Sequence, residues 1–113
     1  MARRKRSIQE HLYNAKRKAR ERNLRWLISD KRALRLLQLP CHYCGAPPNP
    51  YSGLDRLNNE PRYHARTAVP CCWPCNRAKA NMTAVQFIRF CAAVVSRRFH
   101  AVKEGQHLLT MLP

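Results

Sequence analysis

The amino-acid sequence predicts a small α+β domain that needs a staple beyond its apolar core, preceded by a basic helical arm. The chain has 113 residues, which is the size of one domain. Apolar residues make up 45% of the composition, but only three are Phe and two are Trp, so the core is modest. Six cysteines, five of them between residues 41 and 90, supply the material for a staple.

Positive charge dominates the chain and is concentrated in its first third. Lys and Arg total 22 against 6 for Asp and Glu, which gives a formal charge of +16. Residues 1–40 hold 13 of the basic and 3 of the acidic side chains. A chain with this charge repels itself unless a polyanion neutralises it. We therefore expect nucleic acid, either DNA or RNA, to be the partner. The longest apolar run, residues 92–95, is far below the roughly 18 residues of a membrane span, so we expect no membrane partner.

The N-terminus predicts a reducing compartment for the cysteines. Its first residues are basic and lead into no apolar secretory segment. We therefore expect an intracellular location, either a bacterial or phage-host cytoplasm or an organelle, with the cysteines reduced or metal-bound. The Arg-rich start is only faintly similar to a mitochondrial presequence, because Glu10 and Glu21 interrupt it.

The arm, residues 1–39, begins with a predicted helix over residues 8–22. Ser7 and Glu10 form a capping box at its start. Asn23 can adopt the left-handed conformation that ends a helix. The apolar residues recur at helical spacing in a thin stripe: Ile8, Leu12, Ala15 and Ala19.

Two further elements complete the arm. Alternating apolar residues predict a short strand over residues 24–28. Ser29 or Asp30 then caps a second helix that continues to Pro40.

The second part of the chain, residues 40–100, is predicted to form the metal-bearing domain. Residues 41–53 are rich in Cys, Pro, Asn and Gly, which indicates loops. A strand over residues 54–57, a turn at 58–61 and a returning strand over 63–69 predict a small hairpin.

A helix follows the hairpin and is expected to provide the packing. Thr83 and Gln86 form a second capping box, and the helix continues to about Phe99. The tail, residues 101–113, receives no assignment. The apolar face of the helix is broad and consists of Val85, Phe87, Ile88, Phe90, Cys91, Val94 and Val95.

Two Cys-x-x-Cys knuckles are the strongest signal in the sequence. Cys41 and Cys44 form the first, and Cys72 and Cys75 form the second. Four thiolates can hold one tetrahedral zinc ion, which makes a structural Zn²⁺ site the prediction. A redox pair is the alternative, but no βαβ pattern surrounds the knuckles. Without the metal, we expect this part of the chain to unfold.

The remaining cysteines and histidines have no metal-like spacing. Cys71 in place of Cys72 would turn the second knuckle into Cys-x-x-x-Cys, so we interpret Cys71 and Cys91 as small buried apolar residues. His42 lies between two ligands and is expected to point outward. The other unassigned histidines are His11, His100 and His107.

The order of these motifs resembles the zinc-containing HNH endonucleases. The motifs are Cys-x-x-Cys-Gly at residues 41–45, Gly-Leu-Asp-Arg-Leu-Asn-Asn at 53–59, and Val-Pro-Cys-Cys-Trp-Pro-Cys-Asn-Arg-Ala-Lys at 69–79. Met82, Thr83 and Phe87 follow them. The similarity is greatest to the small phage-type members and the recombination endonuclease VII group, and it covers roughly residues 24–92. It implies a ββα-metal fold in which a hairpin and a helix hold one divalent cation against a scissile phosphate.

The resemblance also implies a catalytic centre. Asp55 on the first strand and Asn76 at the start of the helix match the family's catalytic-metal ligands, and their hard oxygen atoms suit Mg²⁺ or Mn²⁺. Such an ion stabilises the pentacoordinate phosphorus and the leaving oxygen. From local sequence alone, Asn76 is equally well interpreted as a helix cap.

Several positions depart from the family's pattern. Arg56 stands where a general-base histidine commonly follows the aspartate, and a guanidinium cannot accept a proton. Thr67 lies near the position of the central asparagine. Asn58 replaces the usual aspartate of an Asp-Asn pair, and Arg62 replaces the glycine of a Gly-Tyr turn. These departures leave the general base unassigned.

His64 on the returning strand is a candidate for that base, since histidine titrates near neutral pH. It is equally placed to contact a phosphate backbone. The basic side chains predicted to bind nucleic acid lie in the arm and around the proposed centre: Arg3, Arg4, Lys5, Arg6, Lys16, Arg17, Lys18, Arg20, Arg56, Arg62, Arg66, Arg77 and Lys79.

Two functions therefore remain open. The first is a metal-dependent endonuclease that cleaves phosphodiester bonds. The second is a catalytically inactive HNH-like zinc module that binds RNA or DNA as a structural protein, for example in a ribosomal particle.

Overall fold

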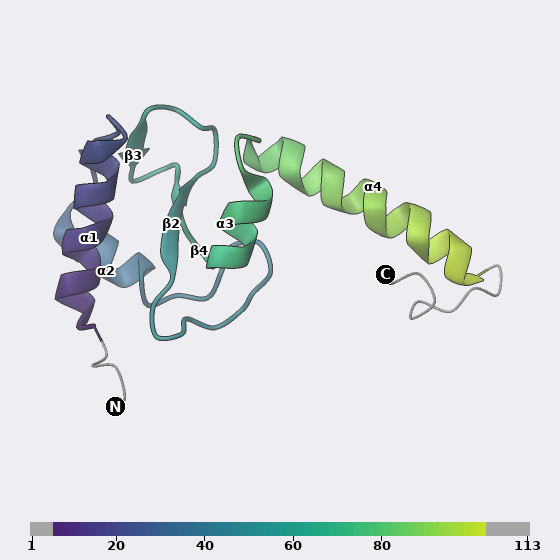
Figure 1. Cartoon of the computed structure of the whole chain (residues 1–113), viewed down its shortest axis with the longest axis horizontal. Coiled ribbons are helices and arrows are strands. Elements are labelled where there is room, and N and C mark those ends of the chain that lie inside the picture. The colour runs from purple at the N-terminus through teal and green to yellow at the C-terminus, as the bar shows by residue number, and fades with distance from the viewer. Residues whose placement is uncertain (1–5, 104–113) are drawn as a thin grey trace.

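A computed structural model describes the backbone of residues 6–103 and the side chains of residues 6–99 (Figure 1). Arg3, Arg4 and Lys5, the tail from residue 104 and the side chain of His100 lie outside the described residues, as does His107. The elements follow the order α1–β1–α2–β2–β3–β4–α3–α4. None of the described helices is long and apolar enough to cross a membrane.

The N-terminal elements form close to where the sequence predicts them. Helix α1 (Ile8–Glu21) begins at Ser7, whose hydroxyl accepts a hydrogen bond from the Glu10 amide at 3.1 Å. Asn23 follows the helix with φ of 58°, which confirms the left-handed stop. Strand β1 (Arg25–Leu27) and helix α2 (Asp30–Leu36) come next. Ser29 is the cap of α2, and this helix ends four residues before Pro40.

The predicted returning strand is two strands that belong to different sheets. Strand β3 (Arg62–His64) pairs with β1 in parallel, while β4 (Ala68–Cys71) pairs with β2 (Gly53–Arg56) in antiparallel fashion. A turn at residues 65–67 separates them, closed by a bond from the Thr67 amide to the His64 carbonyl at 3.0 Å. The prediction of one continuous strand was wrong because the aromatic pair of Trp26 and Tyr63 draws β3 towards β1.

One apolar core joins the two parts of the chain. Helices α1 and α2, together with Ile28 before α2 and Leu37 after it, supply most of its buried side chains, and Leu54 of β2, Tyr63 of β3 and Ala68 of β4 complete it. Residues on both sides of the predicted boundary at 39/40 therefore pack together. The side chains that α1 and α2 contribute are Leu12, Ala19, Ala33 and Leu36, with Leu37 directly after α2.

Helix α3 (Trp73–Lys79) follows β4 and begins one turn earlier than the resemblance implies. Its cap is Cys72, and Pro74 stands in its first turn, where the missing amide proton has no cost. Asn76 lies in the middle of α3 and does not cap it. The prediction of a helix start at Asn76 is therefore wrong.

Helix α4 (Ala84–Lys103) has its buried side chains, among residues 84–99, at its base, and it extends away from the body (Figure 1). The capping box is confirmed, since Thr83 and Gln86 exchange two hydrogen bonds of 2.9 and 3.2 Å. The base is held by the Ala84 amide on the Leu57 carbonyl at 2.7 Å and by the ring of Phe87 against that of Tyr43.

The expectation that this helix provides the packing was wrong. Ala84 and Phe87 are buried, but every later described side chain of α4 is exposed, including Cys91, which we expected to be buried. The physical reason is the direction of the helix, which leaves the body after its first turn. The large apolar side chains that it exposes are Val85, Ile88, Phe90, Val94, Val95 and Phe99.

Candidate metal centre and nucleic-acid interface

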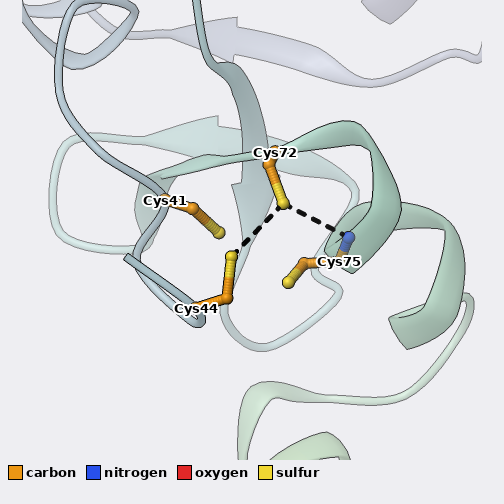
Figure 2. A group of neighbouring side chains, drawn as sticks. All are labelled: Cys41, Cys44, Cys72 and Cys75. Atoms are coloured by element: carbon orange, nitrogen blue, oxygen red, sulfur yellow. Dashed lines mark hydrogen bonds between the residues drawn. The ribbon is translucent and has the colours of Figure 1, made fainter. Parts of the chain in front are cut away.

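Four cysteine sulfurs converge at one point between two segments that are distant in the sequence. Cys41 and Cys44 lie in the loop after α2, while Cys72 and Cys75 lie at the junction of β4 and α3 (Figure 2). All four Sγ atoms lie within 4.8 Å of one another, and those of Cys44 and Cys72 are 3.6 Å apart. Zinc–sulfur bonds of about 2.3 Å in a tetrahedron place sulfurs about 3.8 Å apart. The four cysteines are thus positioned to hold a metal ion and are compatible with structural zinc.

The backbone around the first knuckle explains why these thiols face inward. Gly45 adopts φ of 76°, which side chains rarely tolerate, and its amide bonds to the Cys41 carbonyl at 3.0 Å. The His42 amide donates to the Pro70 carbonyl of β4 at 2.8 Å, which joins this knuckle to the segment that bears the second one. The His42 side chain is exposed, as the sequence predicts.

The thiol acidities indicate a site prepared for a cation. Burial alone would raise the pKa of Cys41, but amide groups of Cys44, Cys72 and Tyr43 outweigh it and lower the pKa to about 6. Burial raises the pKa of both Cys72 and Cys75, and neighbouring thiols add to that rise for Cys75. One thiolate therefore forms readily, and a metal ion would supply the charge that the others need.

Cys71 is separate from this group. Its side chain is only 1% exposed, and burial raises the pKa of its thiol, which fits an inert apolar residue. The predicted choice of Cys72 over Cys71 for the second knuckle is confirmed, because Cys72 belongs to the cluster of four.

Asp55 is buried and already neutralised by a cation of the chain. Its carboxylate accepts a hydrogen bond from the Tyr43 hydroxyl at 2.6 Å and one from the Lys79 ammonium at 3.3 Å. Lys79 is fully buried and also donates to the Arg56 carbonyl at 3.2 Å and the Asn59 side-chain oxygen at 3.1 Å. We call Tyr43, Asp55, Asn59 and Lys79 the buried polar cluster. Lys79 therefore does not lie on the surface, where we had expected it to contact nucleic acid.

Tyr43 connects the metal knuckle to this cluster. Burial raises the pKa of its hydroxyl, and the hydrogen bond to Asp55 and its negative charge add to the rise. The hydroxyl thus remains protonated and donates to the carboxylate. Our sequence analysis missed this residue, and its only signal was an aromatic side chain between two metal ligands.

The other proposed catalytic residues, Asn76 and His64, are not among the hydrogen-bond partners of the Asp55 carboxylate in the described residues. Asn76 is exposed on α3. His64 lies on β3, which pairs with β1, and its Nδ1 accepts a hydrogen bond from the Arg66 amide at 3.2 Å. In the described residues, the single His, Cys, Asp and Glu group suited to a metal is the cysteine cluster. No support for a catalytic Mg²⁺ or Mn²⁺ emerges from this arrangement.

Several basic side chains serve the fold. The Arg56 guanidinium donates to the backbone carbonyls of Asn59 and Glu60 and lies 6.0 Å from the Tyr63 ring centre. Arg62 forms an ion pair with Glu60 at 2.8 Å. On the arm, Lys16 pairs with Asp30 and Arg17 pairs with Glu21.

A second group of predicted cations is exposed. It includes residues of α1, of the β3 region and of α3, and it is joined by Arg22 and Arg25, which the sequence patterns did not single out. Six acidic residues cannot neutralise 22 basic ones, so the surface retains a strong positive field. The exposed members of the predicted set are Arg6, Lys18, Arg20, Arg62, Arg66 and Arg77.

Comparison with known proteins gives one relative. The chain is 31% identical over 95 residues to an uncharacterized protein of Acanthamoeba polyphaga mimivirus. The match covers 82% of this chain but 18% of the relative, so the chain spans less than a fifth of that protein's length. No protein-family model matches the sequence. No solved structure matches it either.

Proposed function

We propose that this chain is a zinc-stabilised module that binds nucleic acid through its exposed cations and leaves the phosphodiester bonds intact. The observation that supports binding is the set of exposed basic side chains on a helix that is itself packed on the core. Lys18 and Arg20 of α1 and its C-cap residue Arg22 are exposed, while Leu12 and Ala19 of α1 are buried. A packed helix holds its charges in fixed positions, so less conformational entropy is lost when phosphates bind.

The buried polar cluster favours binding over cleavage. A nuclease of the HNH type needs its aspartate free to hold a divalent cation, and in this chain Lys79 and Tyr43 occupy the Asp55 carboxylate. Displacing a buried ammonium would leave it without its counterion, which is costly. The cluster therefore serves the fold, and the positive surface retains the ability to bind.

We further propose that the scaffold is HNH-like and that its metal is Zn²⁺. The antiparallel pair β2–β4 followed by α3 matches the ββα order, and four thiolates in tetrahedral reach suit zinc better than harder ions. Reduced cysteines require a reducing compartment, which favours an intracellular location. DNA and RNA are both candidate partners, including structural RNA in a ribonucleoprotein particle. Elemental analysis of purified protein should find one zinc per chain.

Salt dependence of binding tests the proposal. The zinc-loaded chain should bind duplex DNA and duplex RNA with log K falling against log salt by about 0.9 per neutralised phosphate on B-DNA. Lys18→Gln with Arg20→Gln should weaken binding and flatten that slope by about two. The matched control, Arg97→Gln with Arg98→Gln on α4, removes equal charge far from α1 and should have a smaller effect. Binding without salt dependence would contradict the proposal.

A nuclease is the second candidate, and the same ββα order is the observation that favours it. Asp55 lies on the first strand of that unit and Asn76 on its helix. Supercoiled plasmid incubated with the protein and Mn²⁺ or Mg²⁺ should remain supercoiled under our proposal. Asn76→Ala is the informative variant because Asn76 is exposed and its loss spares the core. Nicking by the wild type that disappears in Asn76→Ala would establish cleavage.

A further inference from the structure

A cleft of about 280 Å³ lies between α1 and the face formed by β2 and α3. Helix α1 contributes His11, Lys18 and Arg22, which share one side of the helix because they are spaced by seven and four residues. Trp73 and Asn76 of α3 form part of the opposite wall. This volume is near the lower limit for small-molecule sites, so the cleft suits one small ligand or one small part of a larger ligand.

The charge of the cleft favours an anion. Lys18 and Arg22 are exposed, and the acidic partners of α1 are engaged by other cations, namely Lys16 and Arg17. No Asp or Glu lines the cleft among residues 6–99. A phosphate group can therefore approach this wall without repulsion.

The cleft is also rich in flat aromatic surfaces. Both tryptophans of the chain, Trp26 and Trp73, line it. Trp73 is 69% exposed, with the Arg77 guanidinium 5.1 Å from its ring centre. Tyr63 packs against Trp26 at 5.4 Å between ring centres. Aromatic faces beside cations are what an unpaired base uses for stacking.

A polar side chain completes the site. The exposed Asn76 amide supplies both a donor and acceptors on the opposite wall.

We propose that this cleft binds one unstacked nucleotide of a single-stranded nucleic acid. The phosphate lies against Lys18 and Arg22, the base stacks on the exposed ring of Trp73, and the Asn76 amide hydrogen-bonds to the nucleotide. A base inside a duplex is stacked on both sides and cannot enter. This inference rests on the proposed nucleic-acid binding and specifies the form of strand that is preferred.

Tryptophan fluorescence tests the inference directly, because both tryptophans line the cleft. Zinc-loaded full-length protein is titrated with oligothymidylate, with a duplex of equal length, and with thymidine monophosphate at one salt concentration. The single strand should quench the emission and bind several-fold more tightly than the duplex. Thymidine monophosphate should quench only at much higher concentration. Equal or tighter binding of the duplex would overturn the inference, and so would equally tight binding of the free nucleotide.

Two variants separate the cleft from general charge. Lys18→Gln with Arg22→Gln should weaken single-strand binding by at least about tenfold and duplex binding by less, and Trp73→Ala should also weaken single-strand binding selectively. The control, Arg97→Gln with Arg98→Gln, should change the affinity for the single strand and for the duplex by the same factor. Circular dichroism checks that each variant is folded.

The outcomes distinguish this inference from the proposed function. If the cleft and control variants lose equal affinity while salt-dependent duplex binding persists, the cleft inference fails and the proposed function stands. If no nucleic acid binds, both fail.

Discussion

The first forty residues and the segment from residue 41 to residue 79 are stabilised in different ways. Helices α1 and α2 bury apolar side chains such as Leu12 and Leu37. The second segment contains a loop of about a dozen residues, and its order depends on four thiols and on the buried polar cluster. Strands β2, β3 and β4 contribute to both, because Leu54 and Ala68 belong to the apolar core. The difference teaches that one small chain can combine apolar packing with a group of four thiols positioned to hold a metal ion and with buried polar contacts.

Removal of the metal should have the largest effect, and it should separate the stability of the two regions most clearly. Structural zinc contributes about 10–16 kcal/mol of apparent binding free energy in small domains, so chelation should unfold residues 41–79. Helix α1 should retain more amide protection, since its core contacts are apolar. Hydrogen exchange read by mass spectrometry before and after chelation measures both regions. Cys91→Ser is the control and should keep its zinc, and an unchanged exchange pattern after chelation would contradict the prediction.

Loss of the buried cation should be the largest effect of a single substitution. Lys79→Met leaves the Asp55 carboxylate buried without its counterion, which costs about 3–5 kcal/mol. Urea unfolding of the zinc-loaded protein measures this cost. The double variant Asp55→Asn with Lys79→Met removes both charges and should recover part of the stability. A single variant as stable as the wild type would show that the pair contributes nothing.

A cavity in the apolar core should cause the next largest loss of stability. Leu37 is fully buried, and Leu37→Ala should lower the free energy of unfolding by about 3 kcal/mol through lost burial and the cavity left behind. Zinc affinity should change little, because the metal knuckles are held by other contacts. Leu39→Ala is the matched control, since Leu39 is 40% exposed and should cost much less. If both variants lost the same free energy of unfolding, burial of Leu37 in the core would not explain its effect, and the prediction would be contradicted.

Per pH unit, the smallest expected effect is the change in zinc affinity. Burial raises the pKa of Cys72 and Cys75, so zinc must displace their protons, and affinity should rise with pH. Each displaced proton changes the binding free energy by about 1.4 kcal/mol per pH unit. Because the pKa of Cys41 is lowered to about 6, the dependence should become steeper below that pH. Competition with a chromophoric chelator measures it, and a flat profile would contradict this account.

Local signals in the sequence predicted the elements that depend on neighbouring residues. The capping residues Ser7 and Thr83, the stop at Asn23 and the two cysteine knuckles all act over a few positions, and the structure contains each of them. Amide donors and metal ligands have fixed geometric needs, so short patterns suffice to indicate them.

Features that depend on distant partners were not predicted. The split of residues 62–71 between two sheets requires β1 to accept β3, and no pattern within that stretch indicates it. Lys79 can be buried because Asp55 and Asn59 lie at positions where their oxygen atoms accept hydrogen bonds from its ammonium group. Helix α4 has an apolar face typical of a packed helix, and its exposure follows from the direction in which the chain leaves the body.

The attachment of α4 at one end makes it a pointer whose tip magnifies movement at its base. Twenty residues of helix measure about 30 Å, so a tilt of about 10° displaces the far end by about 5 Å. The base touches Tyr43, which also bonds to Asp55 and stands between two metal ligands. A rearrangement around the thiolates that tilts α4 would therefore displace its far part, and a pair of spin labels, one on the body and one introduced by Arg98→Cys, would register that displacement.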